Sequence, residues 1–136
     1  MKNAIIKLIA ATLLTAACAA GKYDDARGVM EQLVAAYEGF NSSIEAANDK
    51  QSMLSTIKTL SEKVSELIPK SKTIMAKYPE AKSKSTMPKE LEATFNKLRE
   101  VQKIMTQKYE TEKIKRLLID PEVKEANEKL VKTMYN

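Results

Sequence analysis

The sequence predicts an all-α fold: an up-down antiparallel bundle of three long helices and a short C-terminal helix, preceded by a signal peptide. The clearest reason is the segment 88–116, where positions recur at alternating steps of four and three residues. That spacing places six side chains on one stripe of an α-helix: Leu91, Phe95, Leu98, Gln102, Met105 and Tyr109. The other positions of the segment are highly charged, so the stripe needs further helices to cover it.

The composition is a second reason. The chain has 136 residues, with three glycines, four prolines, 43% apolar residues and 30% charged residues. This balance is typical of a single helix-rich globular domain. Because tryptophan is absent and aromatic residues are few, we expect a core of aliphatic and methionine side chains.

The amino terminus has the layout of a secretory signal peptide. Lys2 and Lys7 give a short basic start, and an apolar run of ten residues follows from Leu8 to Ala17. Ten residues are too few to span a bilayer, which needs about twenty. We therefore expect residues 1–17 to be a signal peptide, cut between positions 17 and 20, and residues 22–136 to form the helical domain. The alternative is a buried first helix.

Two outcomes are open for Cys18, the only cysteine. The segment Leu14-Thr15-Ala16-Ala17-Cys18 resembles the bacterial lipobox, which would make Cys18 an acylated first residue, although Thr15 stands where the pattern has leucine. Alternatively, Ala17 and Ala19 form an ordinary cleavage site and Cys18 is removed. Both outcomes place the protein outside the cytoplasm, in the periplasm or lipid-anchored to the outer membrane of a bacterium. Loss of Lys2 and Lys7 lowers the net charge from +5 to +3.

The residue inventory argues against several kinds of chemistry. The chain has no histidine and a single cysteine, which excludes an internal disulfide, a histidine or cysteine metal cage and any catalytic pair that needs histidine. Carboxylate neighbours such as Glu110 and Glu112 point away from each other on a helix. We therefore expect no enzymatic activity and no cofactor. Export disfavours nucleotides and nucleic acid as partners, and nothing in the sequence indicates an oligomeric state.

The first mature helix is expected at about 24–47, with Asp24 and Asp25 at its positive end. Asn48 or Asp49 then caps the next helix, and Asn48 with Gln51 has the pattern of a capping box. In that second helix the apolar spacing continues to Tyr78 across Pro69. A proline in a helix removes one hydrogen bond, so Pro69 either kinks one helix or separates two.

Residues 79–87 are expected to be an exposed, mobile loop. The third helix is expected over 88–116, but its late core positions hold Glu112 and Arg116. Either this helix changes partner or it ends earlier than the pattern implies. Asp120, Pro121 and Glu122 restart the chain as cap, first-turn proline and acidic first turn, giving a last helix over 121–135. The second and third helices have similar predicted lengths and a short connection, which favours antiparallel neighbours.

The strongest functional indication is an uneven distribution of charge. Residues 70–89 carry six lysines against Glu80 alone: Lys70, Lys72, Lys77, Lys82, Lys84 and Lys89. Residues 22–49 carry a net charge of −4. The lysines are candidates for contact with anionic lipid headgroups or with an acidic envelope protein, at about 1 kcal/mol per lysine near such a surface. The alternative is an ordinary solvated end of a lysine-rich bundle.

The second half also resembles small, uncharacterised, lipoprotein-like helical proteins that bacteria export. The residues that carry this resemblance are Lys77-Tyr78-Pro79-Glu80, Met87 to Leu91 and Asp120 to Val123. The resemblance implies a fold and a compartment, but no activity. We therefore expect an exported helical bundle that binds at the cell envelope. The alternative is a periplasmic holdase-type chaperone with an exposed apolar groove formed by Ile104, Ile114 and Leu118.

Overall fold

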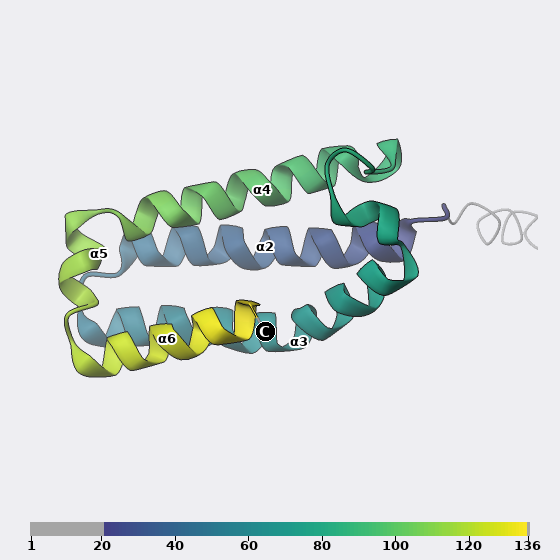
Figure 1. The fold of residues 1–136 in the computed structure, drawn as a ribbon. Helices are drawn as coiled ribbons and strands as arrows, with labels where there is room; N and C mark the ends of the chain where they lie inside the picture. The colour runs from purple at the N-terminus through teal and green to yellow at the C-terminus, as the bar shows by residue number, and fades with distance from the viewer. Residues whose placement is uncertain (1–20, 136) are drawn as a thin grey trace, which may run out of the picture.

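A computed structural model describes residues 21–135, and these residues form helices joined by short turns, with no strand among them. The prediction of an all-α fold is confirmed. The expected signal peptide and Cys18 lie outside the described residues. With the labels of Figure 1, the helices are α2 (Asp24–Ala46), α3 (Lys50–Lys77), the single 3-10 turn η1 (Pro79–Lys82), α4 (Lys89–Tyr109), α5 (Glu112–Leu117) and α6 (Pro121–Tyr135).

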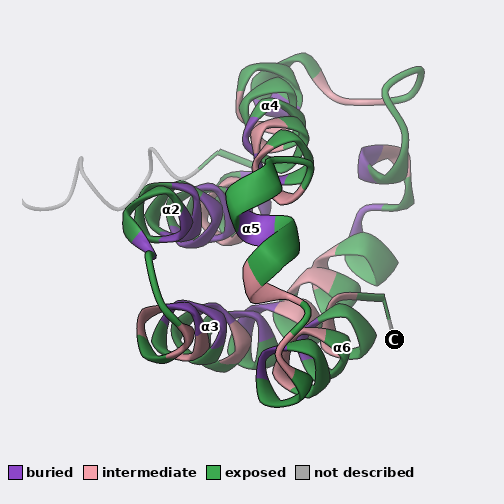
Figure 2. Ribbon diagram, turned by 90° about the vertical axis from the view of Figure 1, so that its left-hand side faces the viewer, coloured by how far each residue is buried: buried purple, intermediate pink, exposed green. Residues whose placement is uncertain are grey.

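The helices α2, α3, α4 and α6 run alongside one another, and each reverses the direction of the one before it (Figure 1). Helix α2 packs against both α3 and α4, and α3 packs against α6. Seen end on, the spatial order is therefore α4, α2, α3, α6, with the short α5 crossing the end of the molecule from α4 to α6 (Figure 2). Helix α6 is shorter than the other three and ends part of the way along α3.

The main core lies between α2, α3, α4 and α6, and the short α5 contributes Ile114 to it. Its most completely buried side chains are aliphatic or methionine, as the composition predicts: Ile44, Met53, Ile57, Leu60, Val64, Ile114, Val123 and Leu130. Burying each of the larger ones contributes about 1.5–3 kcal/mol. These positions follow the helical spacing in the sequence, which explains why the stripes of α2, α3 and α6 meet.

A second, smaller core closes the end of the molecule where α2 begins. It is built from Ala26, Met30, Leu91 and two tyrosines, Tyr23 and Tyr78, together with Ala81 of η1. Both cores consist entirely of described residues. The described helices therefore share a packed interior built from their own residues, and residues 21–136 are the fragment chosen for the binding experiments.

The start of α3 is capped by Asp49 and not by the expected pair of Asn48 and Gln51. The Asp49 side chain accepts a hydrogen bond from the Ser52 N–H at 2.8 Å, and Ser52 Oγ in turn accepts one from the Asp49 N–H. Serine therefore performs the reciprocal role that usually belongs to glutamate or glutamine. Of the two cap candidates in the sequence, Asp49 is the one that caps α3, and the capping box pairs it with Ser52 and does not pair Asn48 with Gln51.

Helix α3 passes through Pro69 without interruption. Of the two alternatives for this proline, the structure has one kinked helix, and Figure 1 shows the C-terminal part of α3 bending toward the start of α2. Thr73 Oγ1 donates a hydrogen bond to the Pro69 carbonyl oxygen at 3.1 Å, just beyond the bend. The bend brings Tyr78 into the second core, where it packs beside Tyr23.

The third long helix is shorter than predicted. Helix α4 ends at Tyr109, and a new short helix, α5, begins at Glu112. Thr111 between them is extended, and its N–H bonds to the Lys108 carbonyl oxygen at 3.2 Å. An unbroken helix would direct Glu112 and Arg116 into the core. The break reorients the chain so that Ile114 is buried instead, with 2% of its surface exposed.

The start of α6 agrees with its predicted signals. Asp120 Oδ1 accepts hydrogen bonds from the backbone N–H groups of Glu122 at 2.9 Å and Val123 at 3.3 Å. Among residues 21–135, no helix is long and apolar enough to cross a membrane.

Candidate functional site

The six candidate lysines are all exposed, but the structure divides them into two groups. Lys77, Lys82, Lys84 and Lys89 lie around η1, at the end of the molecule where α2 begins (Figure 1). Lys70 and Lys72 lie five to seven residues earlier on α3, roughly 8–11 Å back along the helix at ~1.5 Å per residue. The lysines that gather at the tip are therefore fewer than the sequence predicted.

Sequence reasoning missed one basic residue at this tip. Lys22 belongs to the segment counted as acidic, yet its Nζ lies 3.6 Å from Glu80 Oε1 on η1. Lys22 and the loop lysines are far apart in the chain, so only the path of α3 brings them together. We call the cluster of Lys22, Lys77, Lys82, Lys84 and Lys89 the basic end.

Two lysines of the basic end are already paired. Lys77 Nζ lies 2.6 Å from Asp25 Oδ2, and Lys22 contacts Glu80. Lys82, Lys84 and Lys89 form no ion pair with any residue that the structure describes. The last three are therefore the charges most available to an external anion. Lys70 of the other group is paired with Glu66 on its own helix at 2.6 Å.

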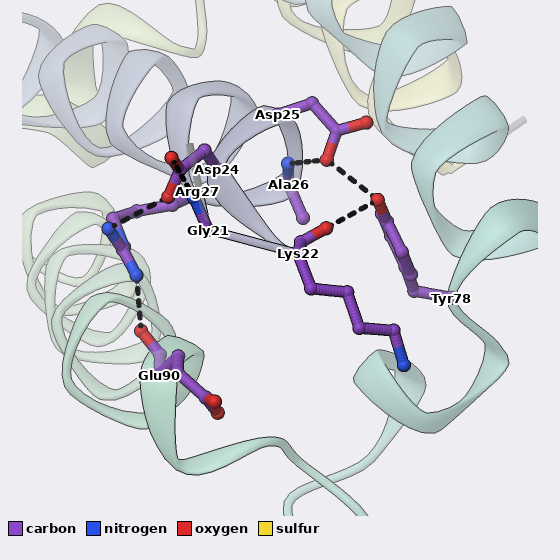
Figure 3. A network of polar contacts seen from close by, with 8 residues as sticks. All are labelled: Gly21, Lys22, Asp24, Asp25, Ala26, Arg27, Tyr78 and Glu90. Carbon is purple, nitrogen blue, oxygen red and sulfur yellow. Dashed lines mark hydrogen bonds and ion pairs between the residues drawn. The ribbon is translucent and has the colours of Figure 1, made fainter. Parts of the chain in front are cut away.

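A network of polar contacts attaches the first turn of α2 to this end of the molecule (Figure 3). The Tyr78 hydroxyl lies 2.7 Å from the Lys22 carbonyl oxygen and 3.0 Å from Asp25 Oδ1. Asp25 Oδ1 also accepts a hydrogen bond from the Ala26 N–H at 2.9 Å. On the other side, Arg27 joins Asp24 to the Glu90 carbonyl oxygen at the start of α4. The chain from Gly21 onward is thereby held against α3 and α4.

This network changes the proton affinity of its charged groups. The hydrogen bond from Lys77 lowers the pKa of Asp25 below its usual value, and the bonds from Tyr78 and Ala26 act in the same direction against some desolvation. The pKa of Lys77 is correspondingly raised, first by Asp25 and then by Tyr78. Hydrogen bonds from its own backbone N–H and from Tyr23 lower the pKa of Glu80. All these groups are therefore charged at neutral pH, which stabilises the arrangement.

The loop that carries Lys82 and Lys84 contains more structure than predicted. Pro79–Lys82 forms a 3-10 turn, and Ala81 within it is buried in the second core. Thr86 Oγ1 donates to the Glu80 carbonyl oxygen at 2.7 Å, and the hydroxyls of Ser83 and Ser85 lie 2.8 Å apart. The expectation of a loop exposed along residues 79–87 is therefore wrong for its first part. The two lysines are presented on a hydrogen-bonded turn.

The negative charge of residues 22–49 does not form a separate acidic face. Asp25 forms an ion pair with Lys77. Glu38 forms one with Lys97, with 3.2 Å between nitrogen and oxygen, and Glu45 forms one with Lys108 at 2.8 Å. The acidic residues of α2 are thus largely matched by lysines of α3 and α4. In the folded structure, the uneven charge distribution of the sequence therefore consists mainly of the lysines of the basic end that form no ion pair with a described residue.

The apolar groove that the chaperone alternative needs is not built from the residues proposed for it. Ile114 is buried in the main core, and Ile104 and Leu118 are partly buried.

Gln102, the polar residue of the apolar stripe, is exposed, and the neighbouring Val101 is buried in its place. The described residues include no group of three or more cysteine, aspartate or glutamate side chains placed to hold a metal ion.

No protein-family model, curated protein or solved structure matches this chain.

Proposed function

We propose that this protein is exported and binds at the bacterial cell envelope without catalysing a reaction, and that the basic end is the surface that contacts anionic lipid headgroups. The observation that carries the proposal is the position of Gly21 at the same end as Lys82, Lys84 and Lys89. Residues 21 and 18 are three apart, a span of at most about 11 Å at ~3.3–3.6 Å per residue.

That short span gives the two outcomes for Cys18 different consequences. If Cys18 is acylated, its lipid would hold Gly21 within about 11 Å of the membrane, a distance comparable to the Debye length of ~8–10 Å near physiological salt. If Cys18 is removed, the lysines act alone. Three unpaired lysines would then contribute on the order of 3 kcal/mol, which gives weak and reversible binding. An acyl chain and a basic patch together attach a protein to a membrane durably, because the two interactions reinforce each other.

The tip chemistry favours a broad anionic surface over a single bound anion. Lys82 and Lys84 are exposed at and just after the 3-10 turn, and Lys89, also exposed, begins the next helix. Their positions are maintained by the Tyr23, Tyr78 and Asp25 contacts behind them. A membrane surface can meet all three charges at once.

The test is binding of residues 21–136 to vesicles that contain phosphatidylglycerol. We expect Lys82→Glu with Lys84→Glu to lower the partition coefficient by about thirtyfold or more, since each lysine contributes ~1 kcal/mol. The matched control is Arg116→Glu with Lys124→Glu, which makes the same charge change on α5 and α6 at the opposite end. Equal losses for the two variants would show a general effect of net charge and would contradict the proposal.

The state of Cys18 has its own measurement. The intact mass of the protein purified from the envelope of an expressing bacterium distinguishes an acylated Cys18 from a chain that begins after it. An acylated mass supports a lipid-anchored protein, and an unmodified shorter chain supports a periplasmic protein that docks through lysines alone.

A further inference from the structure

One side of the helix arrangement is closed less completely than the others. Helix α2 packs on α3 and α4, and α3 packs on α6, but α4 and α6 are not among the closely packed pairs. In the end-on view, α4 and α6 lie at separate corners, with α5 crossing between them (Figure 2). The hydrogen bond from the Tyr109 hydroxyl to Asn127 Oδ1, at 2.7 Å, joins the two helices across this seam.

A cavity of about 210 Å³ lies in the seam beside that hydrogen bond. Met105 and Leu130, both buried, contribute to its wall together with Met134. Val131 and Tyr135 also line it. Phe40 stacks on the Tyr109 ring at 5.9 Å between centroids. Apart from Thr106, Asn127 and the hydroxyl groups of Tyr109 and Tyr135, the lining is apolar.

Exposed apolar surface gathers at this cavity. Four large apolar side chains are exposed in the described part of the chain, and two of them, Val131 at 42% and Tyr135 at 81%, line the cavity. Methionine is flexible and polarizable, so Met105 and Met134 can adapt to a guest. Burial also raises the pKa of the Tyr109 hydroxyl to about 12.

The dimensions limit what the cavity can hold. Its lining follows α6 from Asn127 to Tyr135, a length of about 12 Å at ~1.5 Å per residue. The volume exceeds the roughly 150 Å³ that encloses one benzene ring and falls below the roughly 300 Å³ at which pockets for drug-sized molecules begin. A largely apolar site of this volume, lined along about 12 Å of α6, suits a single hydrocarbon chain.

We infer that the seam between α4 and α6 binds one unbranched alkyl chain of a single-chain amphiphile, with the chain lying along α6 between Met105 and Val131. The Tyr109 and Asn127 pair closes the seam beside the chain. The inference does not depend on the basic end, because the cavity involves none of its residues.

The experiment is calorimetric titration of residues 21–136 with sodium alkanoates and with neutral alkyl glucosides, from hexyl to decyl, below their micelle concentrations. Each added methylene should tighten the dissociation constant about fourfold until the cavity is full. The two head groups distinguish a fatty acid from a neutral amphiphile. If both series show the same dependence of the dissociation constant on chain length but the alkanoates bind more tightly, the ligand is a fatty acid. If the two series bind with equal affinity, the ligand is a neutral amphiphile. Absence of saturable binding, or no dependence on chain length, overturns the inference.

Two pairs of variants locate the site. Thr106→Glu places a charge at the cavity, and Thr73→Glu is its control, since both threonines are exposed and donate to the carbonyl four residues before. Val131→Trp fills the cavity, and Met75→Trp is the control at a similarly exposed position on α3. We expect at least tenfold weaker binding for Thr106→Glu and Val131→Trp, with the controls unchanged. Equal effects within either pair contradict the assignment.

Discussion

Lys77 Nζ lies 2.6 Å from Asp25 Oδ2, so that the last residue of α3 is bound to the first turn of α2. The two residues are 52 positions apart in the chain. Their pairing has two effects. It holds the start of the described chain near η1, and it occupies Lys77, one of the lysines predicted to contact an anionic partner. The lysines that stay available are those of the turn that follows.

The same pair predicts an acid-sensitive contribution to stability. The folded-state pKa of Asp25 is lower than the unfolded value of ~3.9, so this contribution is complete above that value and is lost as the pH falls through the folded pKa. Asp25→Asn should therefore flatten the fall of the urea midpoint below about pH 4. The control is Glu31→Gln, another carboxylate of α2. An unchanged slope in Asp25→Asn would contradict the role given to the pair.

Removal of the α3 cap should cost a predictable amount. Asp49→Ala removes the acceptor of the Ser52 N–H, and the free energy of unfolding should fall by about 1 kcal/mol. Asp49→Ser keeps a capping oxygen and should lose much less. Urea unfolding at neutral pH measures both variants, and equal losses would show that the cap is not the cause.

Two isoleucines give a matched test of the core. Ile57 is 1% exposed and Ile119 is 77% exposed. Ile57→Ala should lower the free energy of unfolding by about 2–5 kcal/mol, because it removes buried methyl groups and leaves a cavity. Ile119→Ala should change it by less than about 0.5 kcal/mol. Similar values for the two would mean that α3 does not pack as described.

Tyr109 predicts a loss of stability in alkali. Its folded pKa is about 12, above the unfolded value of ~10, so its contribution is complete below pH ~10 and is lost as the pH rises toward 12. Tyr109→Phe should remove that part of the alkaline decline, and it should also remove one tyrosine transition near pH 12 from the ultraviolet titration. If the missing transition lies near pH 10 instead, Tyr109 is not buried.

Much of the fold follows from local patterns. The stripes of α2, α3 and α6 have regular spacing, and Asp120 with Pro121 is an unambiguous helix start, so these elements and their buried faces were predictable. The end of α4 was not, because the break at Thr111 depends on tertiary packing: it is favoured by burial of Ile114 and by keeping Glu112 and Arg116 in water. Sequence spacing alone describes both the broken and the unbroken helix.

The candidate site was predictable only in part, for a similar reason. The run of lysines is visible in the sequence. However, the pairing of Lys77 with Asp25 and the position of Lys22 beside Glu80 depend on contacts between segments that are distant in the chain. The seam cavity has no sequence signal, since Met105 and Leu130 have the spacing of ordinary core residues. It arises from the relative positions of α4 and α6.

The central claim is that the basic end docks on an anionic membrane. The most direct test is co-sedimentation of residues 21–136 with phosphatidylglycerol vesicles and with phosphatidylcholine vesicles, at low and at high salt. We expect binding to the phosphatidylglycerol vesicles at low salt, loss of that binding at high salt, and no binding to the phosphatidylcholine vesicles. Equal binding to both lipids, or no binding to phosphatidylglycerol at low salt, would contradict it.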